Sequence, residues 1–300
     1  MVIGSLSLDQ LRVLVTIADT GSFSAAGRKL GRVQSAVSQA VATLEATQGV
    51  ALFDRSGHRP QFTEIGRVLL DQARLVLASA ARFEAVAAGT REGLEPELAL
   101  AIDPLVPTAP LIESLRALSE TFPDLPVSFS TEALGGSLRR LRSGSAALAI
   151  CLLLPGVPDD IAAYPLLRVA MLPVVAPGHP LASLGRPATR SDLEPHVQLV
   201  LSDPVDPGGA AYGLSSARLW RFVDLGRRLD FLLAGFGWCR MPGHLVATPI
   251  AEAKLVALRI DDDPTPGEGL VIYAAHRRDR ALGPAGHWLL DRLRQRLAIA

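Results

Sequence analysis

The first 90 residues place apolar side chains at the three- and four-residue spacing of helix faces. The first such face ends at Thr20-Gly21 and consists of Leu8, Leu11, Leu14, Val15 and Ala18. A second, short helix is predicted over 23–30 with Ser22 as its cap, and a third over 34–47, ended by Gly49. The predicted inward face of the third helix is Val37, Val41 and Leu44.

A hairpin-like segment and a long helix follow these three helices. Leu52-Phe53 starts the hairpin, 56–60 is its loop, and Thr63 caps a helix from Glu64 to about Ala88. At 1.5 Å per residue this helix is roughly 37 Å long. Its apolar positions are Ile65, Val68, Leu69, Leu75, Val76, Phe83 and Val86. A lone helix of this length needs a partner to cover its apolar stripe.

Turn-forming residues at 89–93 mark a domain boundary, and strand and helix patterns alternate beyond it. The first set has strands at 98–102, 127–131 and 146–154, with helices at 108–120 and 138–142. The second set has strands at 169–175, 197–201, 237–241 and 255–258, with helices near 190–193, 224–234 and 244–251. A further strand at 270–274 and a closing helix at 282–297 follow. Such alternation predicts two α/β lobes with parallel-type sheets and crossover helices. We expect the first lobe at 91–165 and 267–300 and the second at 166–266.

Composition excludes several classes of protein. The chain has 300 residues, 49% of them apolar, and a mean hydropathy of +0.28, which excludes a disordered chain and allows a large core. Lys+Arg and Asp+Glu number 30 each, which excludes a uniformly basic nucleic-acid coat. Residues 1–90 nevertheless carry nine basic against seven acidic side chains. Neither a membrane span nor a secretory signal is visible, so we expect a cytoplasmic protein.

Two short helices joined by a tight turn and followed by a basic hairpin are the pattern of a winged helix-turn-helix. The second helix of such a pair enters the major groove of DNA, where Gln and Ser side chains bind base edges. The candidates for base contacts are Gln34, Ser35, Ser38 and Gln39. The candidates for phosphate contacts are Arg28, Lys29, Arg32, Arg55, His58 and Arg59. The alternative is a small helical bundle with solvated arginines.

Seven short runs occur in one spacing over about 60 residues. They are Leu8-Asp9-Gln10-Leu11, Thr20-Gly21-Ser22-Phe23-Ser24-Ala25-Ala26, Gln34-Ser35-Ala36-Val37-Ser38, Leu44-Glu45, Gly49-Val50, Leu52-Phe53-Asp54-Arg55 and Thr63-Glu64-Ile65-Gly66. Together they resemble the N-terminus of LysR-type transcriptional regulators, and a weaker resemblance continues at 177–181 and 192–193.

The resemblance implies an all-α winged helix-turn-helix at 1–62 and a long linker helix at 63–90 that forms a homodimer. It also implies a two-lobed α/β effector domain at 91–300 that resembles type 2 periplasmic binding proteins. A small-molecule effector in the cleft between the lobes would then modulate binding to double-stranded promoter DNA. Members of the family are usually homotetramers.

Three positions depart from the family pattern. Val33 stands where Ser usually begins the recognition helix, and the lost cap costs about 1 kcal/mol. Gln39 stands where Arg is common, and no Lys or Arg lies between Gln34 and Thr47. Gly27 stands where Ala is usual, which costs about 1 kcal/mol in a helix. We therefore expect DNA binding to depend on the wing arginines and on avidity, with lost DNA specificity as the alternative.

Candidate effector contacts lie after the predicted strands, because ligands of open α/β sheets bind at the carboxyl ends of strands. They are Asp103, Pro104, Leu105, Thr131, Glu132, Cys151, Leu201, Ser202, Met241 and Pro242. Thr131 and Ser202 could bind a small polar group, whereas the two acidic residues argue against a dianionic effector. Each candidate is alternatively a cap or loop residue. Tyr212 and Trp220 could cover a ligand, with lobe core as the other interpretation of Trp220.

The sequence also bears on several other functions. Cys151 and Cys239 permit a thiol redox switch, the alternative being two small buried apolar side chains. An enzyme is disfavoured because HExxH, GxSxG, GxxxxGK[ST] and CxxC are absent. The six histidines lack ligand spacing, so we expect neither metal nor cofactor. A pure solute-binding module leaves the first 90 residues unexplained. The sequence therefore predicts a non-enzymatic LysR-type regulator.

Overall fold

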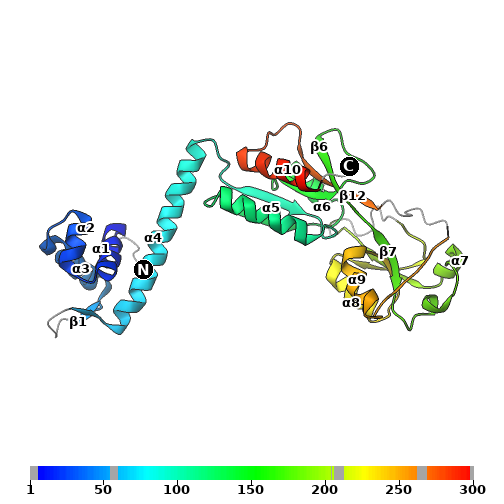
Figure 1. Ribbon diagram of the computed structural model, residues 1–300, viewed down its shortest axis with the longest axis horizontal. Helices are drawn as coiled ribbons and strands as arrows, with labels where there is room; N and C mark the ends of the chain where they lie inside the picture. Colours follow the sequence, from blue (N-terminus) through cyan, green and yellow to red (C-terminus); the bar gives the residue numbers. More distant parts are fainter. Residues whose placement is uncertain (1–5, 55–59, 204, 206–212, 262–268, 298–300) are drawn as a thin grey trace. The chain divides into compact units, whose positions relative to one another are not determined.

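The computed structural model describes residues 6–54, 60–203, 205, 213–261 and 269–297. The chain divides into two compact units, Met1–Ala88 and Gly89–Ala300 (Figure 1). The described helices include none that is long and apolar enough to span a membrane.

The first unit contains three short helices, a two-stranded hairpin and a long helix. These are α1 (Leu8–Thr20), α2 (Phe23–Leu30), α3 (Gln34–Gln48), β1 (Phe53–Asp54), β2 (Gln61–Phe62) and α4 (Glu64–Arg91). The two strands pair in antiparallel register. The predicted helices and hairpin are thus confirmed to within a few residues at their ends.

Local capping explains where these helices begin and end. Ser22 accepts a hydrogen bond from the Ala25 N–H, and Thr63 accepts one from the Gly66 N–H at 2.9 Å, as the sequence predicts. At the start of α3, Val33 makes no side-chain cap. A Cβ on Gly27 would lie 2.7 Å from the Arg32 carbonyl oxygen, so glycine lets the α2–α3 turn pack closely.

One small apolar core holds the first unit together. The predicted inward face of α3 is confirmed, since Val37, Val41 and Leu44 are all buried. The predicted face of α1 is partly wrong: Leu8 is exposed, whereas Val13 and Ile17 are buried. The reason is that α1 packs against both α2 and α3, so its buried face is wider than one stripe.

Most of the apolar stripe of α4 has no partner within the described chain. Leu70 and Ala73 are buried against the core of the first unit. The exposed apolar residues of this helix are Ile65, Val68, Leu75, Val76 and Phe83, the last with 77% of its surface exposed. An apolar stripe of this length in water is unfavourable, so the helix requires a covering partner.

The second unit is built on two five-stranded sheets, one in each lobe. The first has the order β4 (Val127–Thr131), β3 (Leu98–Ile102), β5 (Leu148–Leu152), β12 (Leu270–Arg277), β6 (Ile161–Val169). The second has the order β11 (Val256–Ala257), β7 (Met171–Val175), β10 (Trp238–Pro242), β8 (Val197–Leu201), β9 (Arg218–Phe222). The helices of this unit are α5 (Thr108–Thr121), α6 (Gly136–Ser143), η1 (Pro180–Ser183), α7 (Arg190–Leu193), α8 (Leu225–Leu233), α9 (Gly243–Ala251) and α10 (Pro284–Leu297).

Both sheets are mixed rather than parallel throughout. Strands β3, β4 and β5 are parallel, as are β8, β9 and β10. In contrast, β12 is antiparallel to both β5 and β6, and β7 is antiparallel to β10. The expected 169–175 strand is two strands, because the chain leaves the first sheet after Val169 and enters the second at Met171. The Ala170 carbonyl between them accepts a hydrogen bond from the Gly243 N–H at 2.8 Å.

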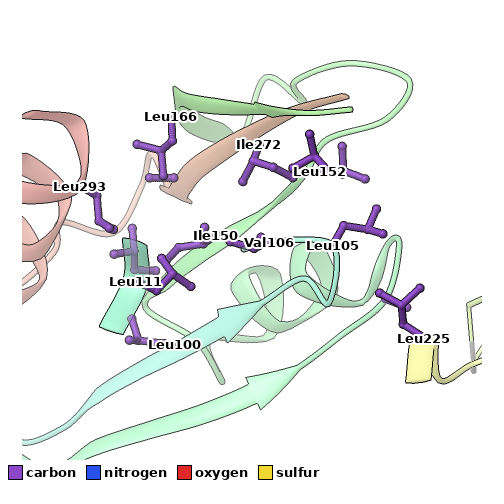
Figure 2. Packing of buried hydrophobic residues seen from close by; sticks show 14 of the residues in the cluster. Leu100, Leu105, Val106, Leu111, Ile150, Leu152, Leu166, Leu225, Ile272 and Leu293 are labelled. Atoms are coloured by element: carbon purple, nitrogen blue, oxygen red, sulfur yellow. The ribbon is translucent and has the colours of Figure 1, made fainter. Parts of the chain in front are cut away.

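The lobes share one apolar cluster. It includes Leu100, Ile150 and Leu293 of the first lobe and Leu199 and Leu225 of the second. Figure 2 shows Leu105 and Val106, which follow β3, in the same cluster as Leu225 from the start of α8. The carboxyl end of β3 therefore lies where the two lobes meet.

Candidate DNA-binding surface and effector pocket

The candidate base-contacting residues lie together on α3. Gln34, Ser35 and Gln39 are exposed, and Ser38 is half-buried. Gln34 and Ser38 also line a hollow whose other walls come from the α1–α2 turn, Phe53 and β2. Polar side chains at the start of α3 are therefore free to meet base edges.

The described candidates for phosphate contact lie near the α2–α3 turn. Arg28 donates to the Ser24 hydroxyl at 3.0 Å, and Lys29 is exposed. Arg32 instead forms a two-pronged ion pair with Asp9, at 2.7 and 2.8 Å. This hydrogen bonding lowers the pKa of Asp9 and raises that of Arg32. Of the other candidates, Arg55, His58 and Arg59 lie outside the described residues.

Glu45, which was not among the candidates, positions the hairpin. Its carboxylate accepts hydrogen bonds from the N–H groups of Leu52 (2.7 Å) and Phe53 (3.1 Å). The Phe53 ring packs between Phe23 and Phe62, with ring centroids 4.9 and 4.3 Å away. The wing is thereby fixed to α2 and α3 by one half-buried carboxylate and three aromatic rings.

A cavity of about 130 Å³ lies between the two lobes of the second unit. Leu105, Leu134, Leu152 and Leu154 form its wall on the first lobe. Met171, Gln198, Leu199, Val200, Leu201, Gly213, Arg228 and Arg240 form the wall on the second lobe, and Leu270 of β12 completes it. Apolar walls with a few polar groups are typical of small-molecule sites.

Two of the polar wall residues form hydrogen bonds with the segment 213–216, whose Gly213 also lines the cavity. The Gln198 amide donates to the Gly213 carbonyl at 2.8 Å and accepts from the N–H groups of Ser215 (2.9 Å) and Ser216 (3.2 Å). Arg240 donates to the same Gly213 carbonyl at 3.3 Å. These side chains therefore hold the segment 213–216 against the cavity wall.

Arg228 differs from these two residues. It lies on α8 and is only 5% exposed. One of its terminal nitrogens donates to the Arg240 carbonyl oxygen and contacts the Met241 sulfur, while its Nε has no partner. Desolvation by burial lowers the pKa of this guanidinium. No described carboxylate forms an ion pair with it.

An ion pair crosses between the lobes next to this cavity. Arg139 of α6 in the first lobe donates to both carboxylate oxygens of Asp203, which follows β8 in the second lobe. The two contacts measure 2.5 and 2.7 Å. Leu134, which begins the turn into α6, has a φ of 51°, a conformation that costs energy for a branched side chain.

The structure distributes the predicted effector contacts unevenly. Leu105 and Leu201 lie in the cavity wall. Asp103, Cys151, Ser202, Met241 and Pro242 are buried but do not line it, and Pro104 is half-buried. Thr131 is exposed, and Glu132 forms a 2.7 Å ion pair with Arg140. Tyr212 lies outside the described residues, and Trp220 is 40% exposed and packs on Phe231 and Phe236.

Asp103 occupies an unusual position after β3. Its side chain is 1% exposed; one oxygen accepts from the Leu105 N–H at 2.9 Å, and the other has no hydrogen-bond partner. Burial raises the pKa of this carboxyl to about 7, since desolvation outweighs the backbone hydrogen bonds.

The two cysteines lie in different sheets, Cys151 in β5 and Cys239 in β10, and both are buried. Burial raises the pKa of Cys151 to about 12 and also raises that of Cys239. A redox-sensing thiol needs access and a lowered pKa, so this geometry does not favour a redox switch.

The family comparisons cover almost the whole chain. Residues 91–298 match the model described as the LysR substrate binding domain, and residues 8–67 match that of bacterial regulatory helix-turn-helix proteins of the lysR family. The chain belongs to the LysR family. The resemblance and the fold class predicted from the sequence are therefore confirmed.

Individual LysR regulators resemble the chain over nearly its full length. It is 32% identical to the probable HTH-type transcriptional regulator YhaJ of Escherichia coli K12, over 95% of each chain. It is 34% identical to a probable hydrogen peroxide-inducible genes activator of Mycobacterium avium, over 90% of this chain and 88% of that one. A solved structure of an OxyR variant from Corynebacterium glutamicum superposes with a TM-score of 0.53 at 26% identity, covering 96% of this chain and 92% of the other. The chain is thus a LysR-type transcriptional regulator with an effector-binding domain.

Proposed function

We propose that this regulator binds promoter DNA through α3 and the wing, and that a small molecule in the cavity between the lobes modulates that binding. The observation that carries the effector role is the cavity itself, whose walls come from both lobes. A ligand held by both walls stabilises one lobe arrangement over others, which is the differential contact that a ligand-driven change requires. Binding of the small molecule thus regulates DNA binding and is not followed by a catalysed reaction.

On DNA, Gln34, Ser35, Ser38 and Gln39 read bases, while Arg28, Lys29, Arg32 and the wing residues Arg55, His58 and Arg59 contact phosphates. The exposure of Gln34 and Ser35 at the start of α3 supports the first assignment. Because α3 carries no Lys or Arg, affinity depends on the cations around it. Because its partner is DNA, we infer that the protein acts in the cytoplasm.

The regulator acts as a homodimer through α4, and two dimers form a homotetramer. Support for the dimer comes from the exposed stripe of α4, in which Val68, Leu75 and Phe83 lack a partner in the described chain. Pairing would also place two recognition helices on one DNA fragment, and avidity would compensate for a weak single site.

Fluorescence anisotropy tests the DNA role. The full-length protein is titrated with the DNA upstream of its gene and with a scrambled fragment, at two salt concentrations. Tighter binding to the upstream fragment, steeply lost with added salt, is the expected result. Equal weak binding to both fragments would contradict specific binding to that promoter.

A further inference from the structure

A buried cation without an acidic partner forms part of the wall of the effector cavity. Arg228 is 95% removed from solvent, and its contacts are a backbone carbonyl, a methionine sulfur and the Cys239 side chain. Burying a guanidinium without a counter-ion is costly, because the water lost is not replaced by a negative charge. The other cavity-wall arginine, Arg240, is only half-buried.

The rest of the cavity wall restricts what can neutralise this cation. Its described residues include no Asp or Glu, and nine of them are Leu, Val or Met. Asp203, two residues beyond the wall residue Leu201, is already paired with Arg139. An anionic group of a bound ligand can therefore pair with the charge of Arg228. The rest of that ligand must be apolar, because it would contact the apolar wall.

The cavity volume sets the size of that molecule. The cavity of about 130 Å³ is similar to the engineered cavity of about 150 Å³, also lined by apolar side chains, that takes up one benzene ring. An apolar body of about one ring, or a branched aliphatic chain of similar volume, therefore fits between Leu105, Leu152 and Leu201.

We propose that the effector is a small carboxylate whose apolar body fills this cavity and whose negative charge binds Arg228. The inference deepens the proposed function and rests on it. A planar guanidinium suits this role because it matches the geometry of a carboxylate. The Nε of Arg228 is a buried donor without a hydrogen-bond partner, and Arg228 lines the cavity, so a bound carboxylate would supply the acceptor that this donor lacks.

A purely structural role for Arg228 leads to different expectations. If the main role of Arg228 is to stabilise the fold through its hydrogen bond to the Arg240 carbonyl, replacing Arg228 destabilises the second lobe. If it is held for a ligand, Arg228→Gln removes an uncompensated buried charge, and the free protein keeps or gains stability. Stability and ligand preference therefore separate the two roles.

The test uses the full-length protein and matched probes in ligand-detected NMR titrations. The probes are benzoate, cyclohexanecarboxylate and 4-methylpentanoate, their uncharged amides, and inorganic phosphate. Arg228→Gln is compared with Arg227→Gln, which removes the neighbouring, exposed arginine of the same helix. Arg228→Lys tests whether a point charge suffices.

We expect at least one carboxylate to bind more tightly than its amide and than phosphate. Arg228→Gln should weaken carboxylate binding about 10- to 100-fold, the range for losing a charge-assisted hydrogen bond, without weakening amide binding. Arg227→Gln should stay within about twofold of the native protein, and Arg228→Lys should lie between the two.

Three results would overturn the proposal: no carboxylate of the set binds, phosphate binds as well as the carboxylates, or Arg228→Gln retains the preference for carboxylates. A loss of stability in Arg228→Gln, seen in urea denaturation, would assign the residue a structural role instead. Promoter binding by the same preparation is measured separately. Specific DNA binding without carboxylate binding rejects only the effector class, whereas loss of specific DNA binding rejects the proposed function.

Discussion

The two units of the chain place their charged groups in opposite ways. In the first unit the described ion pairs are exposed, such as that between Arg32 and Asp9, and the recognition helix carries no cation. The second unit buries Asp103 and Arg228 almost completely, and each retains one polar atom without a partner. Exposed charges suit a long polyanion, whose attraction is spread over many weak contacts. A buried charge suits a single small ligand, because its interaction is weakly screened.

The largest expected effect comes from the buried acid. The pKa of Asp103 is raised to about 7 from an ordinary value of 3.8, so the folded protein binds a proton more tightly than the unfolded chain. Stability is therefore highest below about pH 4 for this group and falls as the pH rises to about 7. Asp103→Asn should remove this loss and raise the free energy of unfolding at pH 8 by up to about 4 kcal/mol.

Urea denaturation of the second unit at pH 5 and pH 8 measures this difference. Asp124→Asn, at an exposed position, serves as the matched control. An equal pH dependence in the native protein and in Asp103→Asn would show that burial does not control this carboxyl.

The next largest effect concerns the wing. Glu45→Ala leaves the N–H groups of Leu52 and Phe53 without their acceptor, which should cost the first unit about 2–4 kcal/mol. Hydrogen exchange should quicken in α3 and the wing while β3 and β5 keep their protection. Glu84→Ala on the exposed side of α4 is the control, and a similar change in both variants would contradict a special role for Glu45.

A smaller effect separates base reading from phosphate contact. Gln34→Ala should relax preference at one base pair by about 1–3 kcal/mol with little change in salt dependence. Lys29→Ala should weaken binding to all sequences alike and lower the slope of log K against log salt by about one. Anisotropy with single-base operator variants at two salt concentrations distinguishes them. Identical behaviour of the two variants would reject this division of roles.

The smallest effect is expected at the exposed ion pair. Arg32→Ala removes the contact with Asp9, but both side chains are well solvated and the pair is screened by salt. Its unfolding midpoint in urea should equal that of the native protein within error. A clear loss of stability would show that surface ion pairs contribute to the stability of the first unit. The difference between weakly contributing exposed charges in that unit and buried charges in the second would then not hold.

The sequence predicts the first unit better than the second for physical reasons. Helix periodicity and capping are local, so the sequence predicts α2 of the first unit at its observed bounds, and it does the same for the short, capped α7 of the second unit. Strand β6 was missed because it contains Pro165, which normally excludes a central strand; β6 lies at the edge of its sheet, where proline is tolerated. Strand β9 was missed because its five residues are mostly exposed, being paired on one side only.

The effector pocket was the least predictable part. The rule on strand ends selects Leu105 and Leu201 but misses Arg228, which lies on a helix. A signal for it exists: Leu225, Arg228 and Leu232 follow the spacing of one helix face, which places the arginine among buried leucines. Its neighbour Arg227 falls on the other face. The unpaired state of a buried charge depends on contacts between distant segments, which periodicity does not encode.

The ion pair between Arg139 and Asp203 affects how long a bound effector stays in the protein rather than how tightly it binds. Because it joins one lobe to the other, any movement of the lobes apart that releases a bound molecule must break this contact or bend it aside. Arg139 is partly solvated, so added salt weakens this ion pair more than it weakens the hydrophobic contacts between the cavity wall and the ligand. Residence time of a bound effector should therefore shorten as ionic strength rises, and the regulator would respond faster to a falling effector level in a saltier cell.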